Sequence, residues 1–227
     1  MIADPRALAE RAADPLVGAL ANLVRLITEA PWQLGPADRA RAQAAGLGDE
    51  SLVQVVLLSS FFGHLNRMAD AIGIELDYPA FTKPPHAEPA TPPYLRPPSA
   101  QWSGAPRASA VALRPGVVAP LAAWRAHALE RAAPLDRRQR AIIAHAVAER
   151  LGDPTQEPAA PVSALDAALV ATADEVTLAP WRLGAGTVDR LRAAGLQDDA
   201  ALFDAIATAA SCTTFSRIRV ALAALGL

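Results

Sequence analysis

The sequence predicts an all-α protein, and three observations support this prediction. Alanine is abundant and aromatic residues make up only 5% of the chain, a composition that favours close-packed helices over a β-sandwich. Residues that cap helices stand at the ends of several apolar segments. Two stretches, residues 31–49 and 180–198, are so alike that they predict two related helical halves. With 227 residues, 52% of them apolar, the chain can bury a sizeable core.

The repeat is strongest over 19 residues. Residues 31–49 read PWQLGPADRARAQAAGLGD and residues 180–198 read PWRLGAGTVDRLRAAGLQD, with ten identical positions. In each stretch we expect a short helix that follows the Pro-Trp-x-Leu-Gly turn and ends at a glycine, Gly46 or Gly195. An aspartate, Asp49 or Asp198, is expected to cap the next helix.

Three segments follow from this repeat. We expect a first helical half at residues 1–76, a proline-rich extended linker at 77–118 and a second helical half at 119–227. Residues 77–120 contain 11 of the 20 prolines, which predicts a stiff strap lying over the surface, where Phe81, Tyr94 and Trp102 could anchor it. The first half is shorter at its start: Ala9-Glu10-Arg11 and Asp14-Pro15 echo only the end of a helix expected at 137–151.

The longer helices can be justified individually. Asp136 is a plausible N-cap with Gln139 as its capping-box partner, and Gly152 should end the helix that begins there. Residues 52–62 are apolar nearly all round, which predicts a central helix buried on every side. Their counterpart, residues 202–217, is smaller and more polar, and we expect it to border a cavity or a subunit contact.

Charge and composition exclude several classes of function. The net charge is −2 with no long run of either sign, so nothing indicates binding to nucleic acid or to a membrane. A single cysteine excludes an internal disulfide and a cysteine-rich zinc site, and the four histidines lack metal-ligand spacing. We therefore expect no metal and no cofactor. The N-terminus lacks a secretory signal and no apolar run could span a bilayer, so we expect a cytoplasmic protein.

Residues 64–76, HLNRMADAIGIEL, resemble the closing motif of the peroxidase-related branch of the alkylhydroperoxidase D-like superfamily, which also includes carboxymuconolactone decarboxylase. That branch typically carries an Asn-Arg-x-Ala-Asp-Ala-x-Gly segment. Residues 120–125, 135–140 and 188–196 also look like parts of the family pattern. The resemblance implies the all-α fold of that superfamily and assembly into symmetric oligomers, so we expect a homo-oligomer.

The resemblance also implies a redox motif that this chain lacks. Active relatives carry a Cys-x-x-Cys pair, followed by a histidine, directly after the helix that matches 137–151. One thiolate attacks the peroxide and the other resolves the sulfenic acid as a disulfide. Residues 152–157 here read GDPTQE. We therefore expect a degenerate member of the family that acts as a non-catalytic or small-molecule-binding oligomer.

Two alternatives stay open: a non-redox, decarboxylase-type enzyme with a histidine acid–base, or a one-cysteine peroxidase using Cys212. The candidate catalytic residues are His64, His145 and Cys212, and the candidate binding residues are Asn66, Arg67 and Arg217. All of these except Asn66 also have a structural interpretation, and His145 is expected to face the core or an interface. Cys212 is expected to be a buried thiol and His64 a hydrogen-bonded core histidine. The two arginines recur in both halves and should hold helix-end carbonyls or a carboxylate.

Overall fold

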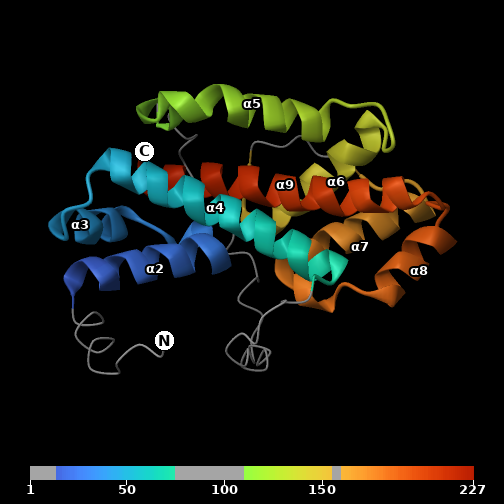
Figure 1. Cartoon of the computed structure of the whole chain (residues 1–227), viewed down its shortest axis with the longest axis horizontal. Coiled ribbons are helices and arrows are strands. Elements are labelled where there is room, and N and C mark those ends of the chain that lie inside the picture. The colour runs from blue at the N-terminus through green and yellow to red at the C-terminus, as the bar shows by residue number, and fades with distance from the viewer. Residues whose placement is uncertain (1–13, 75–109, 155–159) are drawn as a thin grey trace.

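The structure, a computed structural model, describes residues 14–74, 110–154 and 160–227, and within these ranges it contains helices and no strands. The all-α prediction is thus confirmed for these residues (Figure 1). The echo at residues 9–11 and the proposed strap anchors Phe81, Tyr94 and Trp102 lie outside them. No helix in the described ranges is both long enough and apolar enough to cross a bilayer.

The α-helices are α2 (Pro15–Glu29), α3 (Pro36–Ala44), α4 (Asp49–Ile72), α5 (Pro115–Leu129), α6 (Arg137–Leu151), α7 (Ala164–Leu178), α8 (Ala185–Ala193) and α9 (Asp199–Ala224).

Single turns of 3-10 helix complete the fold at η1 (Pro31–Gln33), η3 (Val111–Leu113) and η4 (Pro180–Arg182). The series α2, η1, α3 and the series α7, η4, α8 have equal lengths, and each member of the second begins 149 positions after its counterpart. Helices α4 and α9 begin 150 positions apart. The elements therefore recur at the spacing of the sequence repeat.

The helix boundaries follow local capping chemistry. The Asp136 carboxylate accepts the Gln139 amide at 2.7 Å and the Gln139 side chain accepts the Asp136 amide at 2.9 Å, so the predicted capping box of α6 is confirmed. Gly152 ends that helix with φ of +69°, a left-handed conformation that favours glycine. The Asp198 carboxylate accepts the Ala200 amide at 3.3 Å at the start of α9.

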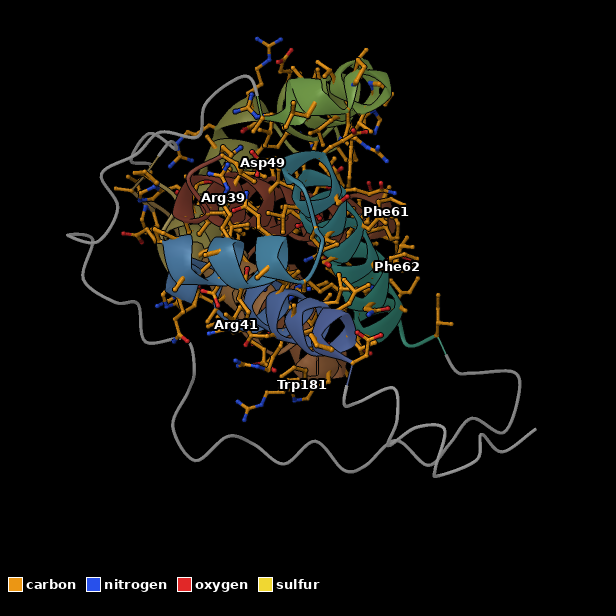
Figure 2. The ribbon with its side chains drawn as sticks, turned by 90° about the vertical axis from the view of Figure 1, so that its left-hand side faces the viewer. Arg39, Arg41, Asp49, Phe61, Phe62 and Trp181 are labelled. Carbon is orange, nitrogen blue, oxygen red and sulfur yellow. The ribbon has the colours of Figure 1, made fainter. Side chains whose placement is uncertain are left out.

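One predicted cap is wrong. Gly48, not Asp49, is the N-cap of α4, and Asp49 is the first helical residue. Its carboxylate is held by the guanidinium of Arg39 on α3, with Nη2 and Oδ2 2.6 Å apart (Figure 2). Asp49 still places a negative charge at the positive end of the helix dipole.

Helix α5 crosses the expected boundary between linker and second half at residues 118 and 119. It begins at Pro115, because the first helical position needs no backbone N–H and suits the fixed φ of proline. Residues 115–118, where we expected an extended chain, form its first turn, and Pro120 lies inside the helix. The described part of the linker is therefore helical from residue 115, while residues 75–109 lie outside the described ranges.

Two apolar cores meet where α4 packs against α9, which Figure 1 shows at the centre of the molecule. The first core joins α2, α3 and the first part of α4 to the C-terminal part of α9, which supplies Ile218, Ala221 and Leu222. The second core joins α6, α7 and the rest of α9, and it includes Trp32 from η1. Each core therefore contains residues from both sequence halves.

The expected burial of residues 52–62 is wrong. Residues 52–62 do not form a helix buried on every side: Leu58, Phe61 and Phe62 are 48%, 44% and 58% exposed. Helix α9 is instead buried along nearly its whole length, although its side chains are smaller and more polar. The reason lies in the neighbours, since α5, α6 and α7 all pack against α9, whereas α4 has no neighbour corresponding to α6 in the described ranges.

Candidate functional site

A cavity of about 480 Å³ lies between α4, α5 and α9. Helix α4 contributes His64 and Met68, α5 contributes Trp124 and His127, and α9 contributes polar and apolar side chains along one side. The residues that line it are His64, Met68, Trp124, His127, Ala128, Arg131, Pro134, Ala200, Phe203, Asp204, Ala207, Thr208 and Ser211. The expectation that the more polar helix of the pair borders a cavity is thus met.

Trp124 anchors α5 over the seam between α4 and α9. Its ring lies edge-to-face against His64 and Phe215, with centroids 4.9 and 5.1 Å apart. The indole N–H donates to the Ser211 hydroxyl at 3.2 Å. One aromatic side chain in an otherwise alanine-rich helix therefore touches both central helices and forms a wall of the cavity.

His64 is half-buried and is neutral at pH 7. Burial lowers its pKa below that of an exposed histidine, the charge of Arg67 acts in the same direction, and a hydrogen bond to the backbone of Ala210 opposes both. Its Nδ1 atom is buried and has no hydrogen-bond partner among the described residues. A neutral imidazole that donates through one nitrogen leaves the other as an acceptor, but the buried Nδ1 is enclosed by protein atoms and is not open to a ligand in the cavity.

The lowered pKa of His64 makes stability depend on pH. The unfolded chain takes up this proton as the pH falls through about 6.5, whereas the folded protein takes it up only at lower pH. We therefore expect wild-type stability to fall as the pH drops below about 6.5, until the folded pKa is passed. In His64→Gln this contribution should be absent. Urea unfolding of both proteins at pH 7.5 and 5.5 tests this; equal losses in the two would contradict it.

A charged cluster forms the side of the cavity next to α9. The Asp204 carboxylate is held by both Arg131 and Arg140. Arg140 is fully buried, and its guanidinium also donates to the Ala128 carbonyl and to the Thr208 hydroxyl, each at 3.0 Å. Two guanidinium groups face one carboxylate, so the cluster is positive by one charge. Arg131, whose side chain is 37% exposed, presents that charge to the cavity.

Cys212 lies one residue beyond Ser211 but does not line the cavity. It is buried, as expected, and burial raises its pKa to about 12, although the charge of Arg219 acts in the opposite direction. In the segment that follows α6, Asp153 is buried and paired with Arg219, the guanidinium Nε lying 2.9 Å from the carboxylate. Neither the buried position of Cys212 nor the position of Asp153 therefore provides a thiolate.

The remaining candidates lie away from the cavity. Asn66 is exposed on α4 and does not line it. His145 is partly buried on α6, with its Nε2 atom 3.9 Å from a Glu149 carboxylate oxygen. Arg67 donates to the Thr177 carbonyl at 3.4 Å and Arg217 to the Thr28 carbonyl at 3.2 Å, both near helix ends. This agrees with the expected structural role of the two arginines.

The sequence made His64 a candidate, but it did not point to Trp124, His127, Arg131 and Asp204, which line the same cavity. These lie 60 or more positions further along the chain, so no local spacing connects them to His64. The usable signal was Trp124 itself, a lone aromatic residue in an alanine-rich helix. In the described ranges no three side chains of His, Cys, Asp or Glu come together as metal ligands would.

Comparison with known proteins gives no further guide, because no family model, no curated protein and no solved structure matches this chain.

Proposed function

We propose that this protein is a degenerate, non-redox member of the alkylhydroperoxidase D-like superfamily that binds a small molecule in the cavity beside His64. The observation that carries the proposal is the combination of a largely apolar cavity that carries a guanidinium with a buried cysteine. The cavity brings a half-buried histidine, an aromatic wall and a guanidinium together, while the thiol of Cys212 stays protonated and outside it.

The proposal includes two related halves that meet like the subunits of a dimer. Arg67 reaches the carbonyl of Thr177 in the other half, and Arg217, 150 positions later, reaches that of Thr28. Thr214 donates to the Ser60 carbonyl at 3.3 Å, and His64, 150 positions earlier, bonds the backbone of Ala210. Reciprocal contacts of this kind are typical of two-fold interfaces. They support an origin of the chain by duplication.

The lining indicates the class of ligand. Trp124, Phe203 and Met68 offer an apolar surface for a flat or aliphatic body. Arg131 offers a positive charge that Asp204 does not fully neutralise, because Arg140 shares that carboxylate. We therefore propose a small apolar or aromatic carboxylate as the ligand.

Titration calorimetry with benzoate tests this proposal. We expect saturable binding to the wild type and binding at least about tenfold weaker to Arg131→Gln, because one charged hydrogen bond is lost. Arg140 still compensates Asp204 in that variant, so the fold should be retained. Arg41→Gln is the matched control, since Arg41 pairs with Asp38 on the surface and lies outside the cavity. Benzoate binding that is equal in all three proteins, or absent from the wild type at millimolar concentration, would contradict the proposal.

A second candidate is acid–base catalysis without redox chemistry. The observation that favours it is that His64 and His127 line the same cavity. A histidine that is neutral at pH 7 can accept a proton, and a second one can return it. Decarboxylation or lactone-opening assays that lose activity in both His64→Gln and His127→Gln would favour this enzyme over a binding protein. Activity unchanged by either substitution would count against it.

A further inference from the structure

The cavity beside His64 runs along one face of α9. The residues of α9 that line it recur at helical spacing, which places them in one row: Ala200, Phe203, Asp204, Ala207, Thr208 and Ser211. Because an α-helix rises about 1.5 Å per residue, Asp204 and Ser211 lie about 10 Å apart along the helix axis. The cavity therefore extends over at least that length.

Helix α5 forms one wall of the cavity and runs antiparallel to α9, as Figure 1 shows. Near the middle of α5, Trp124 donates a hydrogen bond to Ser211. Seven positions further along the chain, Arg131 pairs with Asp204, which lies seven positions before Ser211. The contacts of α5 thus follow the row on α9 from one end of the cavity to the other.

Helix α4 forms a second wall and is also antiparallel to α9. Ser60 accepts a hydrogen bond from Thr214, and His64, one turn later, bonds the backbone of Ala210. Met68 follows after one more turn and lines the cavity. It therefore lies nearer than His64 to the N-terminal part of α9.

The two ends of the cavity differ in exposure. At one end, Phe203 is 52% exposed and the side chain of Arg131 is 37% exposed. At the other end, Ser211 is only 5% exposed, and the rings of Trp124 and His64 meet edge-to-face with their centroids 4.9 Å apart. The guanidinium thus lies at the exposed end and the aromatic wall at the buried end.

The stretch between the two ends is apolar. Met68, Ala128 and Ala207 line it, one from each of the three helices. The hydroxyl of Thr208 lies in the same stretch, but it accepts a hydrogen bond from Arg140 at 3.0 Å. This part of the cavity therefore offers methyl, methylene and thioether groups, which can remove the methylenes of an aliphatic chain from water.

We propose that the cavity binds an unbranched aliphatic carboxylate of about eight carbons, with its carboxylate at Arg131 and its terminal methyl group against Trp124. This inference rests on the carboxylate-binding function proposed above and adds the type and length of the chain. Each methylene of an extended chain adds about 1.3 Å, so about eight carbons span most of the distance from Asp204 to Ser211. A single aromatic ring covers only part of that distance.

Titration calorimetry of the full chain with straight-chain carboxylates, from butanoate to dodecanoate, tests the proposal. We expect the affinity to rise about threefold with each methylene up to octanoate, because each one leaves water. Beyond decanoate the affinity should level off, because the chain has then reached the wall formed by Trp124. A dissociation constant that stays flat from butanoate to octanoate, or that keeps falling at the same rate through dodecanoate, would overturn the proposal.

Ala207→Leu narrows the cavity from within. Ala207 is only partly buried and faces the cavity, so the larger side chain has room without overpacking the core. Octanoate should bind this variant at least about tenfold more weakly, whereas butanoate, which stays near Arg131, should bind as it does to the wild type. Ala193→Leu on α8 is the matched control, because Ala193 is exposed and outside the cavity, and it should change neither affinity.

Two results with Ala207→Leu would contradict the chain placement: octanoate binding equal to that of the wild type, or butanoate binding weakened by the same factor as octanoate binding. The series also separates this inference from the function on which it rests. If benzoate and all the aliphatic acids bind with similar affinity and all are weakened in Arg131→Gln, the carboxylate site stands and the inference about chain length is wrong. If no acid binds, both are wrong.

Discussion

Replacing Asp204 with alanine should destabilise the protein by about 3–5 kcal/mol, the loss typical of a buried ion pair from which one partner is removed. Arg140 has no exposed surface, so its charge would remain in the core with only carbonyl and hydroxyl oxygens around it. Arg131 would lose the same carboxylate. Urea unfolding followed by circular dichroism measures the change in the free energy of unfolding.

The control is Asp199→Ala, because Asp199 pairs with Arg192 at the surface and its side chain is 85% exposed. Exposed pairs contribute at most about 1 kcal/mol, so this variant should unfold close to the wild type. A double variant, Asp204→Leu with Arg140→Met, should recover part of the loss, because it removes both buried charges together. Equal effects of Asp204→Ala and Asp199→Ala would show that Asp204 is not the counter-ion that holds Arg140.

The thiol of Cys212 should be nearly inert in the folded protein. A rise of its pKa from 9.0 to about 12 lowers the thiolate fraction at pH 7 by a factor on the order of 1,000. Burial blocks access in addition. Reaction with an aromatic disulfide reagent should therefore be at least about 1,000-fold slower than for an exposed cysteine, and should become fast in denaturant.

The reference is Val162→Cys in a Cys212→Ser background, which places one thiol at a highly exposed position. With an alkyl hydroperoxide and a dithiol reductant, the wild type should show no turnover above the buffer rate. Turnover that Cys212→Ser abolishes would make Cys212 a nucleophile and would overturn the non-redox proposal. Comparable reagent rates for Cys212 and for the cysteine at position 162 would contradict the burial described above.

The sequence predicted the features that depend on local chemistry, such as the ends of helices. The bounds of α6 follow from Asp136 and Gly152, because a capping box and a left-handed glycine act over a few residues. The role of Arg67 and Arg217 could be predicted because the repeat itself indicates a shared structural function. Because the repeat has a constant spacing, the order α2, η1, α3 also predicts the order α7, η4, α8.

Which helix is buried could not be predicted in this way. The apolar character of residues 52–62 describes the side chains of α4, whereas exposure depends on the neighbours that the rest of the chain provides. Helices α4, α5, α6 and α7 all pack against α9, so small and polar side chains such as Thr208 are enclosed there, while Phe62 remains exposed on α4. The cavity could not be predicted from the sequence for the same reason, since Trp124 and Asp204 come close to His64 only through tertiary packing.

The sharing of the two cores between halves has a consequence for synthesis of the chain. Leu23, Ile27 and Val56 pack against Ile218 and Leu222, which are translated about 160 to 200 residues later. The first half therefore cannot close its own core as it leaves the ribosome, although domains commonly fold in order from the N-terminus. Its apolar helices stay uncovered until α9 has been synthesised, and during that interval chaperones can bind them. Contacts this distant in sequence also slow folding, because the loop between them must be ordered before the contacts can stabilise it.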